Sequence, residues 1–476
     1  MLFKELRELN ALSVEQTAEM LGVTAKTVYR WEKGEIEPRK AFLRLLEERF
    51  NYRKKPNDHN PDFTFIDLFA GAGGLSEGFI QSGYTPIAHV ESDKAACYTL
   101  KTRTAYHYLK NNDQYDIYVD YLKGKITRDE LFSFIPGEKL DSVINKFIGE
   151  DHNIEIQKQI DDNLNGEKVD LIIGGPPCQA YSLVGRSRSK TKMIGDPRNF
   201  LFTQYVKYLE KYRPKAFVFE NVLGLKSANG GQYLEQMQKL FEKKNYAIKL
   251  FTLEAKNFGV LQNRKRIIII GFDSSSIDPL PQLDQIKVRH DFKVEDLLSD
   301  LPKIQAGQGK NKFLKYSSKP TDYLDAFSIR NGIDVLTQHV ARPNNDQDKE
   351  IYRIAVQKWI NSGERLNYND LPERLKTHNN RNSFIDRFKI VAPELPFSQT
   401  IVAHIAKDGH HFIHPNLKQN RSISVREAAR LQSFPDDYYF EGIKENSNRT
   451  SAFKQIGNAV PPLMAKMIAE NIKSIL

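Results

Sequence analysis

One of the two cysteines in this 476-residue sequence stands where a thiol could act as a nucleophile. Cys178 follows Pro176 and Pro177, just after an apolar run, residues 169–173, that predicts a buried parallel strand. Glycine and proline at the end of a strand force a loop, so we expect the thiol at the carboxyl end of the strand, where open α/β sheets bind ligands. An isolated cysteine is more often a buried structural residue. Whether Cys178 is a nucleophile therefore depends on the other motifs of the sequence.

A carboxylate ends a second apolar run. Residues 216–219 predict another buried strand, and Glu220 follows directly. A carboxylate in this position serves either as a general acid or base or as the cap of the next turn. The residue type fits both roles.

A basic segment precedes a third apolar run. Residues 262–266 read Gln-Asn-Arg-Lys-Arg and lead into the predicted strand 267–270. Alternate residues of an extended segment face one side, so we expect Gln262, Arg264 and Arg266 to converge. The alternative is a solvated basic turn.

A glycine-rich loop begins the catalytic part of the chain. A predicted strand, residues 64–69, runs into residues 70–74 (Ala-Gly-Ala-Gly-Gly) and then into a helical stretch, residues 75–81. Glycines let a ligand approach the backbone at a helix N-terminus. The next strand ends in Glu91, 20 residues after Gly71, where an acid can bind both ribose hydroxyls. These residues predict a nucleoside cofactor and leave open whether it is a nicotinamide dinucleotide or S-adenosylmethionine.

Composition limits the class of protein. A chain of 476 residues is expected to form two or three domains, and two cysteines fit a reducing compartment rather than a disulfide framework. No run of about 18 apolar residues and no signal-peptide pattern is present, so we expect a cytoplasmic protein. The net charge of +10 and the pI of about 9.1 favour a polyanionic partner, although a basic enzyme without one has the same charge.

The first 50 residues read as short helices. Ser13 with Gln16 forms a predicted capping box, Gly22 breaks the helix, and Thr24 caps the next one. A glycine-containing turn followed by a helix with an exposed basic and hydroxyl face is the helix-turn-helix layout. A small helical packing domain is the alternative.

Residues 16–24 and 28–34, together with Pro38, resemble the Cro/repressor type of helix-turn-helix. This resemblance implies that Lys26, Thr27 and Arg30 bind DNA, and such domains often dimerise on palindromic sites. Residues 51–62 are polar and charged and predict a linker.

Six motifs, in this order along the chain, resemble those of the C5-cytosine DNA methyltransferase family. They are residues 67–74 (DLFAGAGG), 176–179 (PPCQ), 220–222 (ENV), 262–266 (QNRKR), 426–436 (REAARLQSFPD) and 455–462 (QIGNAVPP). The motifs extend over most of the chain after residue 63, with one large unmatched interval.

The resemblance implies covalent catalysis. The thiolate of Cys178 adds to C6 of cytosine, so that C5 can take a methyl group. At an ordinary thiol pKa of about 8.5, only about 3% is thiolate at pH 7, so the site must lower that pKa or protonate the base in concert. Glu220 is implied at the cytosine N3, Arg266 at its O2, and Arg264 in support. Burial beside apolar strands would raise the pKa of Glu220, as a general acid requires.

The resemblance also implies S-adenosylmethionine as the cofactor. The residues implied to bind it are Phe69, Ala72, Gly74, Glu91, Pro177, Leu201, Asn458 and Val460. The acid that would hold the adenine amino group is expected at Asp120, with Asp151 as the competing candidate, because the usual hydrophobic-Asp-Ile sequence is missing.

The implied substrate is duplex DNA, from which the target base must be flipped out. Residues 183–195 are rich in Ser, Arg, Lys and Gly, and we expect this loop, with Arg186 and Arg188, to close over DNA and contact phosphates. Four histidines, His404, His410, His411 and His414, cluster farther along. No cysteine lies near them, so we expect a loop near the DNA rather than a metal site.

The predicted fold class is α/β: a Rossmann-like, S-adenosylmethionine-dependent methyltransferase domain with a smaller target-recognition domain, preceded by an all-α helix-turn-helix domain. The predicted boundaries are 1–50 (helix-turn-helix), 51–62 (linker), 63–271 (catalytic core), 272–415 (target recognition) and 416–476 (return to the core).

The sequence therefore predicts a DNA (cytosine-5) methyltransferase of a restriction–modification system, whose N-terminal domain represses its own gene. A tRNA cytosine-5 methyltransferase and a non-enzymatic transcription regulator on the same scaffold are the alternatives. A nicotinamide oxidoreductase would leave Cys178 without a role.

Overall fold

The structure is a computed structural model, and it describes residues 3, 4, 7, 13–21, 23–38, 63–177, 200–274 and 281–476. The chain divides into two compact units, residues 1–62 and 63–476. No helix among the described residues is both long and apolar enough to cross a membrane.

The first unit contains helices α2 (Val14–Leu21) and α3 (Ala25–Glu32). The capping box that begins α2 is present: the Ser13 amide donates to Gln16 Oε1 at 2.9 Å, and the Gln16 amide donates to Ser13 Oγ at 3.1 Å. Thr24 caps α3, as the sequence predicts. The two helices pack around a small core of Phe3, Val14, Ala18, Leu21, Val28 and Trp31.

The second unit is built on a seven-stranded sheet of order β3-β2-β1-β4-β5-β7-β6. The strands are β1 (Phe63–Leu68), β2 (Tyr84–Glu91), β3 (Val143–Asn145), β4 (Leu171–Gly174), β5 (Ala216–Asn221), β6 (Tyr246–Glu254) and β7 (Lys265–Asp273). The first five are parallel, whereas β7 is antiparallel to both β5 and β6. The apolar runs predicted as strands in this region all lie in the sheet.

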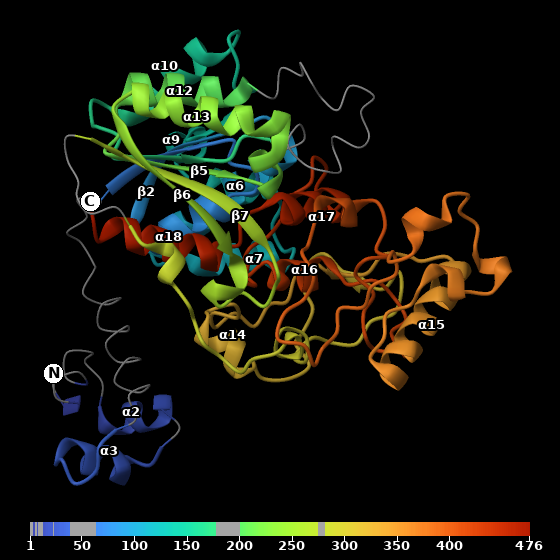
Figure 1. Cartoon of the computed structure of the whole chain (residues 1–476). Helices are drawn as coiled ribbons and strands as arrows, with labels where there is room; N and C mark the ends of the chain where they lie inside the picture. The colour runs from blue at the N-terminus through green and yellow to red at the C-terminus, as the bar shows by residue number, and fades with distance from the viewer. Residues whose placement is uncertain are drawn as a thin grey trace. The chain divides into compact units, whose positions relative to one another are not determined.

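Helices cover both faces of the sheet (Figure 1). One face packs against α10 (Asn153–Leu164), α12 (Leu201–Tyr212) and α13 (Gln232–Lys243). The other face packs against α5 (Gly74–Gln81) and α18 (Pro462–Lys473). This α/β/α arrangement packs the C-terminal helix on the same face as α5 and leaves the carboxyl ends of the parallel strands at one edge.

The segment between β2 and β3 is helical. Residues 118–120 belong to helix α7 (Tyr115–Leu122), which lies between α6 (Lys94–Asn111) and the short helices α8 (Arg128–Ser133) and α9 (Gly137–Asp141). Tyr118, Tyr121 and Leu122 recur at helical spacing and pack with Tyr106 and Tyr439. The strand beside β2 is β3, which the sequence analysis did not identify.

The remaining elements follow β7. They include α14 (Asp322–Ala326), β8 (Gly309–Lys310), β9 (His339–Val340), α15 (Asp346–Ser362), α16 (Val425–Leu431) and α17 (Arg449–Asn458). Short 3₁₀ helices are η2 (Leu223–Gly231), η3 (Ala255–Phe258), η4 (Leu283–Gln285), η5 (Val294–Leu297), η6 (Tyr368–Asp370), η7 (Glu373–Leu375), η8 (Arg381–Phe384) and η9 (Ala403–Ala406).

Two separate cores divide this part of the unit. Residues around η5 and α14 share a core with α16 and α17, and Arg430 joins them through buried ion pairs with Asp300 and Asp436 at 2.5 and 2.6 Å. α15 and the 3₁₀ helices η6 to η8 surround a core of their own (orange in Figure 1). The first half of the predicted recognition region is therefore part of the main core.

Candidate functional site

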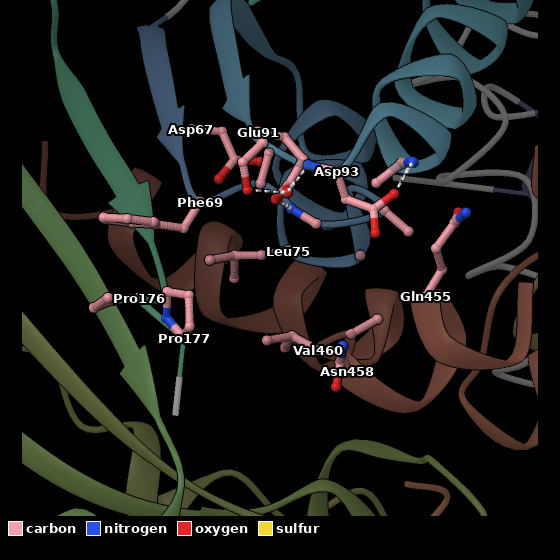
Figure 2. Close-up of a pocket in the computed structure, with 18 of the residues that line it drawn as sticks. Asp67, Phe69, Leu75, Glu91, Asp93, Pro176, Pro177, Gln455, Asn458 and Val460 are labelled. Atoms are coloured by element: carbon pink, nitrogen blue, oxygen red, sulfur yellow. Dashed lines mark hydrogen bonds between the residues drawn. The ribbon is translucent and has the colours of Figure 1, made fainter. Parts of the chain in front are cut away.

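A cavity of about 420 Å³ opens at the carboxyl ends of β1, β2, β4 and β5. Its described wall comes from the end of β1 and the glycine loop after it, the ends of β2 and β3, the turns after β4 and β5, the start of β7, and α17 with the turn that follows it. Figure 2 shows the side chains at this cavity. Segments that are distant in sequence thus meet at one site.

The glycine loop brings backbone close to the cavity. Phe69 has a φ of 59° and Gly73, the N-cap of α5, has a φ of 77°, so the chain turns sharply into the helix. A Cβ added at Gly74 would lie 2.3 Å from the carbonyl oxygen of Val460. Glycine is required there because the turn after α17 passes directly over the loop.

Glu91 closes one end of the cavity at the end of β2. Its Oε2 accepts a hydrogen bond from the Gly71 amide at 2.8 Å, and its Oε1 accepts one from the Asp93 amide at 2.7 Å. Asp93 caps α6 and forms an ion pair with Lys454 of α17 at 2.7 Å. The two bonds orient the Glu91 carboxylate and leave lone pairs for a ligand (Figure 2).

A second charged pair lies in the same cavity. Arg266 Nε lies 2.6 Å from Glu220 Oε1, with both side chains largely buried. Gly175 makes room for this carboxylate, because a Cβ there would lie 2.6 Å from Glu220 Oε2. Asn221 donates to the carbonyl of Pro176 at 3.2 Å and so fixes the turn that leads towards Cys178.

Arg264 does not line the cavity, contrary to the expectation that it converges with Arg266. Its guanidinium is fully buried and donates to the carbonyls of Ile401 at 2.7 Å, Gly457 at 3.1 Å and Ala459 at 2.8 Å. Before β7, the side chains of Gln262 and Arg264 point into the core, where both are fully buried. Arg264 therefore positions the end of α17, which bears Asn458, and the turn after it.

The structure brings most of the predicted cofactor residues together. Phe69, Ala72, Gly74, Glu91, Pro177, Asn458 and Val460 all line the cavity. Leu201 is buried in the first turn of α12 and is not part of the wall.

Asp120 is not part of the cavity either. It lies on α7, where it forms an exposed ion pair with Lys125, so its assignment to the adenine is wrong. The competing Asp151 lies in an exposed turn before α10 and does not line the wall. Cys178, Arg186 and Arg188 fall outside the described residues.

Several cavity residues escaped the sequence analysis. Lys146, Phe147 and Ile148 line the wall directly after β3, and Asp67 lines it from β1. The signal for the first three was the short apolar pair Val143-Ile144 ahead of a polar turn, which is too brief to separate strand from helix by periodicity. Asp67 was part of a recognised motif but received no role.

In the first unit, Lys26, Thr27 and Arg30 all lie on α3, whose opposite face carries the buried Val28 and Trp31. Lys26 and Arg30 are exposed, and Arg30 pairs with Glu35 at 3.2 Å. Thr27 Oγ1 lies 2.9 Å from the hydroxyl of the capping Thr24. The helix thus presents a basic outer face.

The histidine cluster is organised by an arginine. Arg387 lies 2.5 Å from Asp408 and 2.8 Å from His404 Nε2. Among the residues that the structure describes, no group of three or more His, Cys, Asp or Glu side chains could hold a metal ion.

Two family models match the chain. C-5 cytosine-specific DNA methylase matches residues 63–133 and 142–474, and a helix-turn-helix model matches residues 3–54. Type II methyltransferase M.Bpa9945I of Bacillus paralicheniformis is 40% identical over 445 residues, covering 86% of this chain and 98% of the relative. Type II methyltransferase M.SsoII of Shigella sonnei is 28% identical and covers 99% of this chain and 97% of its own.

The fold has a counterpart among solved structures. A prophage-encoded DNA modification methyltransferase (E. coli) superposes with a TM-score of 0.58 at 22% identity, covering 87% of this chain and 99% of that chain. The family model extends over both the sheet and the α16–α18 region that together form the cavity. The chain belongs to the C-5 cytosine-specific DNA methylase family and carries an N-terminal helix-turn-helix domain.

Proposed function

We propose that the chain transfers a methyl group from S-adenosylmethionine to C5 of a flipped-out cytosine in one specific duplex DNA sequence, as the modification enzyme of a type II restriction–modification system. The observation that carries the proposal is the composition of one cavity. Glu91 and the glycine loop lie at one end, and the Glu220–Arg266 pair lies beside Pro176 and Pro177, which lead directly to Cys178.

The cavity residues fit S-adenosylmethionine by their donors and acceptors. The Glu91 carboxylate, oriented by two backbone amides, would accept from the ribose hydroxyls. Phe69, Ala72 and Val460 offer apolar surface, and the glycine loop allows close approach to the N-terminus of α5. When bound there, the cofactor supplies an electrophilic methyl group.

Cys178 would make the cytosine ring reactive. Carbon 5 of cytosine is a weak nucleophile, and addition of the thiolate to C6 converts the ring into an enamine-like species. After C5 has taken the methyl group, removal of the C5 proton expels the thiolate and restores the ring. The bond between the Cys178 sulfur and C6, formed in the addition step, breaks in this elimination, so the free cysteine is regenerated.

Glu220 and Arg266 would recognise and polarise the base. Protonated Glu220 can donate to N3 while the thiolate adds, and Arg266 can donate to O2. In the structure the two side chains are paired with one another, so a base that enters the site would replace this contact. Gly175 leaves room for the carboxylate, and Asn221 holds the neighbouring turn through its bond to the Pro176 carbonyl.

We also propose a division of the chain by role. Residues 63–271 and 416–476 form the catalytic core, residues 272–415 include the target-recognition surface, and residues 183–195 with Arg186 and Arg188 contact DNA phosphates. Residues 1–50, with Lys26, Thr27 and Arg30, bind an operator, and residues 51–62 link the two parts. Because the chain has a DNA-binding domain in addition to its target-recognition region, we infer a second DNA target. This target is the promoter of the enzyme's own gene, which a dimer of the N-terminal domain would bind.

A covalent trap tests the proposed chemistry. With S-adenosylmethionine present, duplex DNA that carries 5-fluorocytosine should form an adduct resistant to detergent, because fluorine cannot leave C5 as a proton does. Cys178→Ala should form none. An adduct with tRNA but not with duplex DNA would favour an RNA substrate, and its absence from both would refute the covalent mechanism.

A further inference from the structure

Arg342 is anchored at the end of the 3₁₀ helix η9. Its guanidinium donates to the carbonyls of Ile405 at 2.7 Å, Ala406 at 3.0 Å and Lys407 at 3.0 Å. A guanidinium has five N–H groups, so two remain for a further acceptor. Among the described residues none accepts from them, and the side chain is half-buried.

Arg449, the first residue of α17, lies close to this guanidinium. Phe453 and Ile456 follow it at helical spacing and pack in one core with Ile405 of η9. Arg449 therefore faces η9 from the turn before them. Its charge is near enough to lower the pKa of Arg342.

Within the described part of the chain, no acid forms an ion pair with either arginine. The Nε of Arg449 is buried without a hydrogen-bond partner, and burial lowers the pKa of this guanidinium. Burial and the charge of Arg449 lower the pKa of Arg342 more than the nearby Asp408 and Asp348 raise it. Asp408 is itself paired with Arg387 at 2.5 Å. The two half-buried like charges would therefore be stabilised by an anion.

The helix α17 connects this pair of arginines with the cavity. It begins at Arg449 and ends at Asn458, which lines the cavity wall. Its ten residues span about 15 Å. Each strand of a duplex carries a phosphate about every 3.4 Å along the axis, so DNA that delivers a base to the cavity brings several phosphates within this distance.

We propose that Arg342 and Arg449 together bind one backbone phosphate of the target DNA and so fix the position of the duplex over the cavity. This inference rests on the proposed function. Two planar guanidinium groups suit the oxygens of a phosphate. The exposed Lys407 and Thr450, next to the pair in sequence, add a cation and a hydroxyl donor. Such a contact positions DNA of any sequence and does not select one.

The salt dependence of DNA binding tests the contact. Binding of the full chain to a fluorescently labelled duplex of mixed sequence is measured by anisotropy at several salt concentrations. Arg449→Gln should weaken binding about tenfold at low salt and reduce the slope of log affinity against log salt by about 0.9. A duplex that contains the methylated sequence should lose affinity by the same factor. Arg449→Lys keeps the charge and should keep the slope.

A second variant tests whether both arginines bind the same phosphate. Arg342→Gln should weaken DNA binding less in the Arg449→Gln background than in the wild type, because the shared contact is already lost. Affinity of Arg449→Gln for S-adenosylhomocysteine should stay within about twofold of the wild type, which shows that the far end of α17 is intact.

Arg374 provides a matched control. It is an exposed arginine of η7 that already pairs with Glu350 at 2.6 Å. Arg374→Gln should leave the affinity for DNA within about twofold and the slope unchanged.

Three results separate the inference from its alternatives. An unchanged slope in Arg449→Gln, or an equal loss in Arg374→Gln, would overturn it. If inorganic phosphate protects the wild type but not Arg449→Gln against thermal unfolding, while both bind DNA equally, the pair binds a small anion and the inference is wrong. Failure of the wild type to bind any duplex would instead refute the proposed function.

Discussion

At the scale of single residues, the geometry around Glu220 depends on a missing side chain. A Cβ at position 175 would lie 2.6 Å from Glu220 Oε2 and 3.0 Å from its carbonyl oxygen, so Gly175→Ala must displace the carboxylate. A misplacement of this kind should reduce kcat about 100-fold while leaving affinity for S-adenosylhomocysteine within about twofold. Steady-state kinetics and calorimetry measure both quantities. Gly137→Ala, where a Cβ meets nothing within 4 Å, is the control, and equal activity of the two variants would contradict the assignment.

At the scale of elements, the strands that carry the site could be predicted because each is a continuous apolar run ended by glycine, proline or a charged residue. β3 could not, because three residues show no period. The helix α7 was not predicted either, although Tyr118, Tyr121 and Leu122 recur at helical spacing. Asp120, which the family resemblance suggested as the adenine acid, lies on this helix and outside the cavity wall. Arg264 was expected beside Arg266 because alternate residues of an extended segment face the same side. This rule does not predict which elements pack against that side, and here they bury Arg264 in the core.

Arg264 links β7 to the turn after α17, and its removal should affect both stability and cofactor binding. Arg264→Met leaves three buried carbonyls without this donor, so we expect a loss of about 3 kcal/mol or more in the free energy of unfolding. Affinity for S-adenosylhomocysteine should fall about tenfold, because Asn458 ends α17 and Val460 lies in the turn after it. Urea unfolding and calorimetry test this. Lys265→Met, at the half-exposed neighbour that pairs with Glu254, should change stability by less than about 1 kcal/mol, and a similar loss in both variants would contradict the argument.

At the scale of the whole molecule, buried histidines should make the second unit sensitive to mild acid. Burial lowers the pKa of His339 to about 4 and that of His414 to about 3, from 6.5. Between pH 6.5 and 4.5 the unfolded chain binds protons that the folded chain does not, so stability falls as the pH falls, by about 1.4 kcal/mol per pH unit for each group at most. The pKa of Glu427 is lowered from its ordinary value of 4.5, so its contribution to the stability of the fold is lost only below pH 4.5.

Urea unfolding at pH 7.5, 6.5 and 5.5 measures this slope. His339 is held between the Ser424 hydroxyl at 2.9 Å and the Pro302 carbonyl at 2.8 Å, and His339→Gln should flatten the dependence on pH even if it lowers stability overall. A wild type whose midpoint does not change between pH 7.5 and 5.5 would show that these histidines do not act in this way.

The N-terminal unit should be separable in function from the rest of the chain. Deletion of residues 1–55 should leave the methylation rate within about twofold, because every described residue of the cavity wall belongs to residues 63–476. The same deletion should abolish binding to the promoter of the enzyme's own gene in a gel-shift experiment. Loss of all methylation with retained folding would refute this division of labour.

The most direct test of the central claim is to sequence the DNA of a host that lacks cytosine methylation, after expression of the wild type or of Cys178→Ala. Conversion-based sequencing should find 5-methylcytosine at one position of one short sequence with the wild type, and at no position with the variant. A folded wild type that leaves every cytosine of the host DNA unmodified would contradict the assignment of this chain as a DNA cytosine-5 methyltransferase.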